Sequence, residues 1–251
     1  MSAWTPREMM VVAASQEIAD GELILVGLGV PQIAALLAKA THAPDATLAL
    51  ELGVIAAHPT ESAMGIADPR MWQGAQAVCG MIDVLGYLLH GGRVTMGILG
   101  ALEVDSAGGV NSSVITQDDG TKRRFTGSGG ANDIASLAGR VMVVMSHDPR
   151  KFKARVEFLT SPGRMVDGEP RAKAGLSGLG TASIVTDRAV IDVEDDGLRL
   201  RSVHPGEDAA AVVADTPVAL ASDGVVEAQP PSPGELRLIR EEFDTQGWYT
   251  T

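Results

Sequence analysis

Apolar and polar positions divide the first forty residues into a capped helix, a buried strand and a second helix. Thr5-Pro6-Arg7-Glu8 places a threonine cap, a proline at the first helical position and a glutamate three residues after the cap. This capping box predicts a helix over residues 6–19. Apolar residues spaced for one helical face follow it, so this helix should pack against a larger body.

Residues 21–54 show the pattern of a strand, a helix and a second strand. "GELILVGLGVP" is a continuous apolar run, "QIAALLAKA" has helical spacing, and "TLALELGV" is a second apolar run after a turn at "HAPDA". Two strands joined through a helix are typically parallel neighbours in one sheet.

The middle of the chain continues this alternation. Residues 74–92 have the pattern of a helix, residues 93–105 that of a buried strand, and a turn is expected at 106–109. Residues 124–148 then predict a glycine loop, a helix and another strand.

The last third has a different pattern. Residues 182–203 alternate as an antiparallel hairpin with its turn at 195–197, and a helix of about 233–244, capped near Ser232, follows a proline-rich linker. The patterns together predict a single domain over residues 1–251. Its fold class is α/β, with an open, mostly parallel sheet flanked by helices and a β-rich C-terminal part.

Composition narrows the class of protein. The chain has 251 residues, 45% of them hydrophobic, and a formal net charge of -12 with no basic block longer than Lys122-Arg123-Arg124, which disfavours nucleic acid as a partner. Cys79 is the single cysteine, so an intrachain disulfide and a cysteine-rich zinc site are excluded. Neither a signal peptide nor a membrane-spanning run is evident, and we expect a cytoplasmic protein without a membrane partner.

Two glycine-containing loops are candidates for ligand binding. Gly27-Leu28-Gly29-Val30-Pro31 lies where a strand turns into a helix, as in dinucleotide-binding enzymes, but Gln32 replaces the third glycine of that fingerprint. A nicotinamide-dependent oxidoreductase, with Glu51 as the ribose-binding acid, is therefore one hypothesis. A structural turn is the other.

The second loop is "FTGSGGAND", in which Gly127, Gly129, Gly130 and Ala131 precede a helix that begins near Asn132. Unhindered backbone N–H groups beside a helix N-terminus can stabilise an anion or a developing oxyanion. An anion site and a plain turn are both compatible with this loop.

Other reactive residue types carry weaker signals. The five histidines are dispersed without ligand spacing, so no metal site is expected. Cys79 is predicted to pack within a helix beside Ala77, Val78, Met81 and Ile82. Asp105, at a strand end, is expected to form a turn.

Glu51 is the most informative carboxylate. In "LALELGV" it stands in a run that is otherwise apolar or glycine, and removing a carboxylate from water is costly unless donors pair with it. It could face solvent at a strand end. It could also lie at the edge of the sheet where ligands bind, as a nucleophile or base, with Gly53 leaving room for a bulky ligand.

Five fragments in order resemble the β subunit of class I coenzyme A (CoA) transferases, and most closely the glutaconate CoA-transferase type. They are "VGLGVPQIAALLAKATHAPD", "LELGVIAAHP", "RFTGSGGANDIA", "FLTSPG" and "LRLIREEFD". The resemblance covers nearly the whole chain and implies a partner α subunit, in a hetero-oligomer built from αβ units.

The resemblance also implies a reaction. Glu51 matches the glutamate of the family that attacks an acyl-CoA thioester and carries CoA as a glutamyl thioester. CoA is then a substrate, and no permanently bound cofactor is expected. The loops at Gly27 to Val30 and Gly127 to Ala131 would supply N–H groups to oxyanions and contacts to CoA.

Three positions differ from the pattern of the family. Leu52 follows the glutamate where a small or polar residue is usual, Glu103 stands where relatives often have an uncharged residue, and Gly109 where they often have asparagine. A Glu103 facing the site would disfavour a dicarboxylate substrate. We therefore expect a CoA-transferase for a small carboxylic or dicarboxylic acid, glutaconate- or 3-oxoadipate-like. An acyl-CoA or ring-opening hydrolase and a non-catalytic subunit remain as alternatives.

Overall fold

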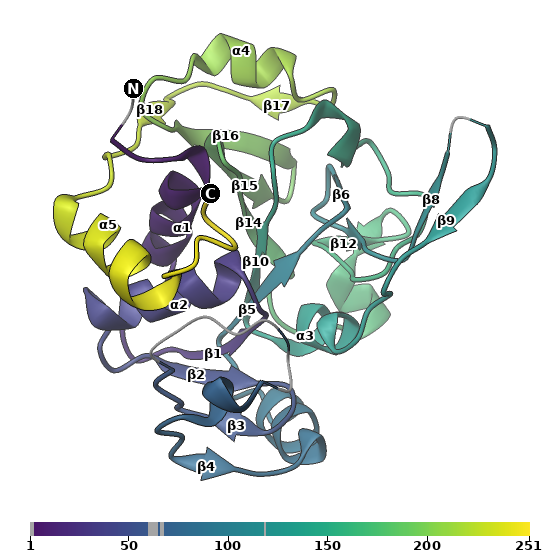
Figure 1. Ribbon diagram of the computed structural model, residues 1–251. Helices are drawn as coiled ribbons and strands as arrows, with labels where there is room; N and C mark the ends of the chain where they lie inside the picture. The colour runs from purple at the N-terminus through teal and green to yellow at the C-terminus, as the bar shows by residue number, and fades with distance from the viewer. Residues whose placement is uncertain (1–2, 60–64, 66–67, 118) are drawn as a thin grey trace.

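A computed structural model describes residues 3–59, 65, 68–117 and 119–251 of the chain, and its centre is an eleven-stranded sheet (Figure 1). Five strands in the middle run parallel in the order β2-β1-β5-β10-β14, and antiparallel strands extend the sheet at both ends. The strands of this sheet are β1 Leu23–Val26, β2 Thr47–Leu50, β3 Val54–Ile55, β4 Ala77–Val78, β5 Met96–Gly100, β10 Arg140–Val144, β14 Thr181–Val185, β15 Ala189–Glu194, β16 Gly197–Val203, β17 Leu220–Ala221 and β18 Val226–Glu227.

Smaller ladders and helices surround this sheet. The ladders are β6 Glu103–Asp105 with β7 Val110–Asn111 and β11 Phe152–Lys153, β8 Val114–Thr116 with β9 Lys122–Arg124, and β12 Met165–Val166 with β13 Glu169–Pro170. The α-helices are α1 Pro6–Gln16, α2 Val30–Ala40, α3 Ala131–Leu137, α4 Ala209–Ala214 and α5 Pro233–Leu238. Short 3-10 turns are η1 Pro69–Trp72, η3 Pro149–Lys151 and η4 Arg171–Ala174, and π-helical segments are η2 Ile82–Leu89 and η5 Ile239–Phe243.

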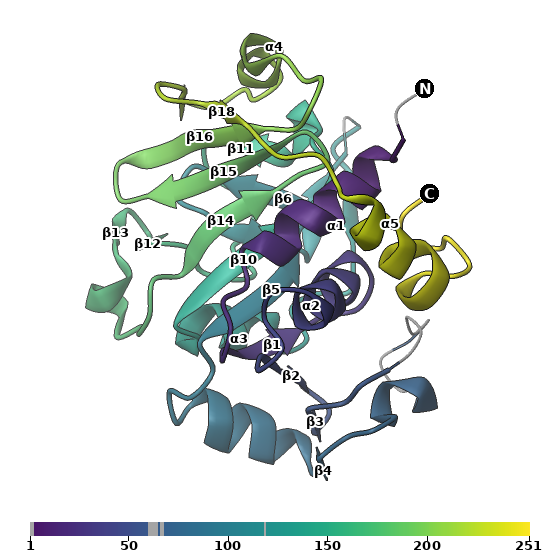
Figure 2. The same ribbon diagram turned by 90° about the vertical axis from the view of Figure 1, so that its left-hand side faces the viewer.

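The elements form three layers, which confirms the predicted open α/β class. Helices α1, α2 and α5 cover one face of the sheet, while α3 and the small ladders lie on the other (Figures 1 and 2). The two faces carry separate clusters of buried hydrophobic side chains.

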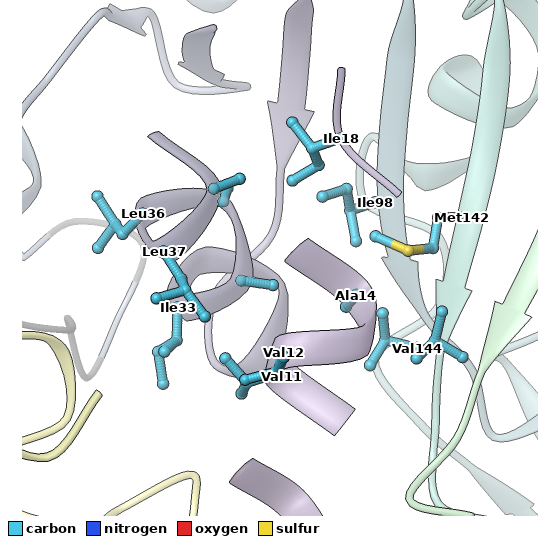
Figure 3. Close-up of a cluster of buried hydrophobic side chains, with 14 of the residues drawn as sticks. Val11, Val12, Ala14, Ile18, Ile33, Leu36, Leu37, Ile98, Met142 and Val144 are labelled. Atoms are coloured by element: carbon cyan, nitrogen blue, oxygen red, sulfur yellow. The ribbon is translucent and has the colours of Figure 1, made fainter. Parts of the chain in front are cut away.

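The first cluster joins α1 and α2 to strands β5 and β10 (Figure 3). Its members include Val11, Val12, Ala14, Ile18, Ile33, Leu36, Leu37, Ile98, Met142 and Val144. Burying each of the larger aliphatic side chains contributes about 1.5–3 kcal/mol, so this layer is the main support of the N-terminal half.

Helix α1 begins as the sequence predicts. Thr5 accepts a hydrogen bond from the Glu8 N–H at 3.1 Å, and the Glu8 carboxylate accepts one from the Thr5 N–H at 2.8 Å. The helix ends at Gln16, earlier than the predicted residue 19, and residues 8–15 are buried because they pack against α2 and the sheet. Arg240 of the C-terminal helix covers the first turn with an ion pair to Glu8 at 2.6 Å.

Three segments differ from their predictions. The strand predicted over 47–54 ends at Leu50, because the chain turns and returns as the antiparallel strand β3. The helix predicted over 74–92 begins as edge strand β4 and becomes helical only at Ile82. The single strand predicted over 93–105 is two strands, β5 and β6, which belong to different sheets.

The C-terminal third agrees with its predictions, except that residues 182–194 hold two strands, β14 and β15, where the hairpin predicted one. Strands β15 and β16 form the expected hairpin, with β14 paired antiparallel to β15. Ser232 caps α5 in a capping box with Glu235, and the helical segment continues to Phe243 as η5. In the part of the chain that the structure describes, we find no helix long and apolar enough to cross a membrane.

Two histidines, the half-buried His147 and the buried His204, lie where β10, β14 and β16 end. The ring nitrogens of His147 lie 3.2 Å from the hydroxyls of Thr186 and Thr216, and Nε2 of His204 lies 2.8 Å from the Thr186 carbonyl oxygen. Burial lowers the pKa of both histidines, and nearby Arg188 lowers that of His147 further, while three carboxylates around the pair partly oppose the shift. The folded protein therefore favours neutral rings.

Lowering the pH through the ordinary histidine pKa is expected to destabilise the fold. The unfolded chain takes up protons from about pH 6.5 downward, before the folded chain does, so the stabilisation present above that pH is lost as pH falls. The free energy of unfolding of the wild type, measured with urea between pH 7.5 and 5, should fall more steeply than that of H147Q/H204Q. Equal pH slopes in the two proteins would contradict the assignment.

Candidate active site

The order of the parallel strands places a ligand pocket between β1 and β5. From β1 the chain moves outward to β2, and it then crosses to β5 on the other side of β1. In open α/β sheets, such a switch point leaves a crevice at the carboxyl ends of the strands, where ligands bind. A cavity of about 170 Å³ lies there, lined by Leu25, Val26, Gly27, Glu51, Ile98, Leu99, Gly100, Ser128, Gly129, Gly130, Ala131 and Ile134.

Glu51 is the first residue after β2, and a tight turn brings its half-buried side chain into this pocket. The Gly53 N–H donates to the Leu50 carbonyl at 2.9 Å to close the turn. Gly53 has φ +106°, and a Cβ there would lie 2.0 Å from the Cys79 carbonyl oxygen. The expectation that Gly53 leaves room for a ligand is therefore wrong, since the backbone of residue 79 occupies that space.

The loop before α3 supplies a donor to the carboxylate. The Gly130 N–H donates to Glu51 Oε2 at 3.0 Å. A Cβ on Gly130 would lie 2.2 Å from the same oxygen, so glycine is required for this close approach. A backbone donor stabilises the ionised form of a carboxylate removed from bulk water.

A small hydrogen-bond network holds the loop in place. Ser112 donates through Oγ to the Gly127 carbonyl at 2.9 Å, and the Gly127 N–H donates to the Ser112 carbonyl at 3.2 Å. The Thr160 hydroxyl accepts a hydrogen bond from the Ser112 N–H at 3.0 Å. The Thr160 carbonyl accepts one from the side-chain amide of Asn132 at 2.7 Å. The "FLTSPG" fragment, which contains Thr160, thus supports the glycine loop.

Three of the four residues predicted for the second loop line the pocket, and one does not. Gly129, Gly130 and Ala131 line the pocket, whereas Gly127 lies outside its lining. The Gly127 N–H is used in the network above, and the Ala131 N–H donates to the Ser128 carbonyl at 2.8 Å. Within the described residues, the N–H of Gly129 has no acceptor, so it is available to a ligand.

Of the predicted residues of the first loop, only Gly27 lines this pocket. Gly27 lines the pocket, but Leu28 packs in a separate hydrophobic cluster with Met71, and Val30 is the first residue of α2. A Cβ on Gly29 would lie 3.2 Å from the Tyr249 ring. The C-terminal tail thus occupies the approach that a dinucleotide pyrophosphate would need, which argues against the nicotinamide hypothesis.

None of the three positions that depart from the family pattern lines the Glu51 pocket. Leu52 is absent from the pocket lining. Glu103 is buried in another direction, accepting from Asn111 at 2.8 Å and pairing with Lys153 at 3.3 Å. The Gly109 N–H donates to the Asp105 carboxylate at 2.8 Å, so Asp105 forms a turn as predicted.

Two further sequence interpretations can be compared with the structure. Cys79 is not helical as predicted: it follows strand β4, and its Sγ lies 3.2 Å from the Gly53 carbonyl oxygen. Among residues 3–59, 65, 68–117 and 119–251, no group of three His, Cys, Asp or Glu side chains could hold a metal ion.

Sequence reasoning did not find the floor and the supports of the pocket. Ile98, Leu99 and Gly100 at the end of β5 carry no chemical signal, because their contribution depends on strand order. Thr160 and Asn132 were visible only as members of the fragments that carry the family resemblance. Their role depends on contacts between segments far apart in the chain.

Fold and site define an open α/β protein with a carboxylate at its switch point, held by a glycine loop at a helix N-terminus. A family model described as coenzyme A transferase matches residues 7–215. The β subunit of 3-oxoadipate CoA-transferase from Pseudomonas knackmussii is 35% identical over 96% of this chain and 94% of its own length. The β subunit of glutaconate CoA-transferase from Acidaminococcus fermentans is 31% identical over 96% of this chain and 93% of its own length.

The solved structures agree with this match. The crystal structure of glutaconate coenzyme A-transferase from Acidaminococcus fermentans has 30% sequence identity and a TM-score of 0.90, covering 99% of this chain and 98% of that one. The chain belongs to the coenzyme A transferase family. The enzyme class predicted from the sequence is confirmed.

Proposed function

We propose that this chain is the catalytic subunit of a CoA-transferase in which Glu51 carries CoA as a glutamyl thioester. The observation that carries the proposal is the Glu51 carboxylate at the switch point, 3.0 Å from the Gly130 N–H and beside the open N–H of Gly129. A carboxylate that accepts a backbone hydrogen bond in a small pocket is suited to nucleophilic attack on a thioester.

The proposed reaction needs only acyl-CoA, the Glu51 carboxylate and the acceptor acid. The Glu51 carboxylate attacks the acyl-CoA carbonyl and expels CoA thiolate, which leaves a mixed anhydride. The thiolate attacks the Glu51 carbonyl, expels the donor carboxylate and forms the glutamyl thioester. An acceptor carboxylate then repeats the two steps in reverse, so Glu51 is regenerated and the acceptor leaves as its CoA thioester.

Gly129 is our candidate oxyanion donor. Each attack places negative charge on a carbonyl oxygen, and a fixed N–H aimed at that charge is typically worth about 3 kcal/mol of barrier. Gly129 lines the pocket beside the Glu51 carboxylate, and its N–H has no acceptor among the described residues. Gly130 instead holds the nucleophile.

The relatives suggest the substrates and the partner. Because the two relatives are subunits of 3-oxoadipate and glutaconate CoA-transferases, we propose an acceptor or donor that is a small carboxylic or dicarboxylic acid. The functional unit pairs this chain with an α subunit, uses CoA as a substrate without a permanently bound cofactor, and works in the cytoplasm.

The α subunit has a candidate docking surface beside Glu51. Trp72, Val78, Met81, Ile82 and Tyr87 are large apolar side chains with exposed fractions of 46–77%. They lie on η1, on edge strand β4 and around η2, at the end of the sheet beyond β2 (Figure 1). The same segment contacts the Glu51 turn through the Cys79 N–H, which donates to the Gly53 carbonyl at 2.8 Å. An apolar surface of this kind indicates a protein interface.

I82D/Y87D is expected to reduce recovery of the tagged α subunit by at least about tenfold, because two charges would be buried without partners. The measurement is co-purification after co-expression. L179D is the control, since Leu179 is 51% exposed and directly precedes β14, which β10, β5, β1, β2 and β3 separate from β4 in the sheet. Unchanged recovery of the α subunit with I82D/Y87D would contradict this docking surface.

Activity of the two-subunit complex tests the proposed function. Acyl-CoA and acceptor acid are incubated with the complex, and both the new CoA thioester and free CoA are quantified. Transfer predicts that new thioester forms with little free CoA. Steady release of free CoA at the same rate with and without acceptor would mean hydrolysis, and would overturn the proposal.

A further inference from the structure

Arg171 is a buried cation whose hydrogen-bond partners are all backbone carbonyls. It is the first residue of η4, and its exposed fraction is 6%. Its guanidinium donates, over distances of 2.7–3.1 Å, to the carbonyl oxygens of Ala135, Ser136, Gly163 and Ser177. Among the residues that the structure describes, no carboxylate pairs with it. Burying a charge is costly, so a guanidinium committed to carbonyls of three segments requires an explanation.

The acceptors of Arg171 join helix α3 to two segments that are distant in the chain. Ala135 and Ser136 lie in the last turn of α3, where carbonyl oxygens have no partner within the helix. Gly163 ends the "FLTSPG" fragment, and Ser177 lies between η4 and β14. A cation at the C-terminus of a helix also interacts favourably with the helix dipole. Arg171 therefore fixes the C-terminal end of α3.

The rest of α3 is tied to the same fragment and to the sheet. The Asn132 side chain donates to the carbonyl of Thr160, three residues before Gly163, at 2.7 Å. Ile134 packs directly on the backbone of β5, since a Cβ on Gly97 would lie 2.2 Å from its Cγ2. Helix α3 runs only from residue 131 to residue 137, and a helix this short is marginal on its own. Its position therefore depends on these contacts.

Helix α3 carries part of the Glu51 pocket. Gly130 immediately precedes the helix and donates to Glu51 Oε2 at 3.0 Å, while Ala131 and Ile134 line the cavity. At a rise of 1.5 Å per residue, about 9 Å separates the Gly130 N–H from the carbonyls of the last turn. Arg171 itself is absent from the pocket lining. A shift at the C-terminal end moves the whole short helix, and the Gly130 donor moves with it.

We propose that Arg171 is a positioning residue, which holds α3 where the Gly130 N–H meets the Glu51 carboxylate. The inference rests on the proposed function, because the rate that Arg171 influences is that of attack by Glu51. Geometry matters here more than charge. A lysine keeps the charge, but its donors share one nitrogen and do not span carbonyls of three segments as a planar guanidinium does.

The first test compares R171K with the control R237K in the two-subunit complex. Arg237 is exposed on α5, which covers the other face of the sheet. We expect R171K to lower kcat about 10- to 100-fold, since a displacement of about 1 Å at a reacting group has this effect. KM for acyl-CoA and for the acceptor acid should stay within about twofold, because Arg171 touches neither substrate. R237K should match the wild type.

A double-mutant cycle separates positioning from a general structural role. G130A moves the Glu51 carboxylate away from the Gly130 N–H, since the added Cβ would lie 2.2 Å from Oε2. If Arg171 acts through that contact, R171K should lower kcat by no more than about twofold in the G130A background. Effects of the two changes that multiply would overturn the inference. An R171K complex with the kcat of the wild type would also overturn it.

Folding of each variant is checked by thermal unfolding and by recovery of the α subunit. R171M, which buries no charge, replaces R171K if R171K does not fold. Failure of both variants to fold would assign Arg171 to folding alone, and would overturn the inference.

Hydrogen exchange followed by mass spectrometry gives a readout that does not require CoA transfer. R171K should exchange at least about tenfold faster than the wild type in the peptide over residues 127–137, with no change over residues 189–203 of the β15–β16 hairpin. This result in a complex that only hydrolyses acyl-CoA would refute the proposed function alone. Equal exchange over residues 127–137, in a complex that transfers CoA, would refute the role of Arg171 alone.

Discussion

E51Q is expected to lower the rate of CoA transfer by at least about a thousandfold, because it removes the nucleophile of a covalent mechanism. Glutamine has nearly the same shape, and its amide oxygen can still accept from the Gly130 N–H, so the pocket should keep its structure. The measurement is kcat in the two-subunit complex with saturating acyl-CoA and acceptor.

The control for this change is E169Q, which alters an exposed glutamate of β13 and should leave kcat unchanged. Thermal unfolding and recovery of the α subunit should match the wild type for both variants. If E51Q retains more than about a tenth of wild-type activity, Glu51 is not the nucleophile. The chain would then have a role other than covalent catalysis.

G130A is expected to lower kcat by about a hundredfold while the protein stays folded. Gly130 has φ -79°, which alanine adopts without strain, so the effect should come from the side chain alone. The added Cβ would lie 2.2 Å from Glu51 Oε2, and the flexible carboxylate must move away. A displacement of about 1 Å at a reacting group typically costs a factor of about a hundred.

The matched control is G234A in α5, where the nearest atom to an added Cβ is 3.9 Å away and φ is not in the left-handed region. Its kcat and thermal stability should stay at the wild-type level. A G130A complex with full activity would show that the contact between loop and carboxylate does not position the nucleophile. A G130A protein that unfolds would show a structural role for the loop instead.

The sequence was sufficient to predict those elements whose conformation depends on residues close together in the chain. The capping box at Thr5 and the cap near Ser232 predicted two helix starts, and the hairpin turn at 195–197 predicted the pairing of β15 with β16. Each of these features depends on residues close in the chain. Their predictions were confirmed for that reason.

Predictions failed where distant segments decide the conformation. Residues 47–54 are apolar enough for one long strand, yet Gly53 turns the chain because the backbone of Cys79 lies against it. The apolar residues of 74–92 predicted a helix, but several of them are exposed on an edge strand and a π-helical segment. The surface proposed to bind the α subunit carries large apolar residue types that also occur in a core, so the sequence pattern alone does not separate the two.

The site was predicted in part for the same reason. Glu51 was identified because a lone carboxylate in an apolar run needs an explanation, and the Gly129–Gly130 loop because consecutive glycines precede a helix. The sequence does not show which N–H group of this loop contacts Glu51 and which ones hold the loop, since this depends on the Ser112 and Thr160 contacts. The strand order that makes the pocket is likewise a property of the fold.

Covalent catalysis by Glu51 can be observed by mass spectrometry of the two-subunit complex after incubation with acyl-CoA and no acceptor. Borohydride or hydroxylamine trapping should convert the glutamyl thioester into a stable product. We expect a mass change confined to the peptide that contains Glu51 and absent from E51Q. An unmodified Glu51 peptide, with acyl-CoA still converted to product when acceptor is added, would refute the covalent mechanism.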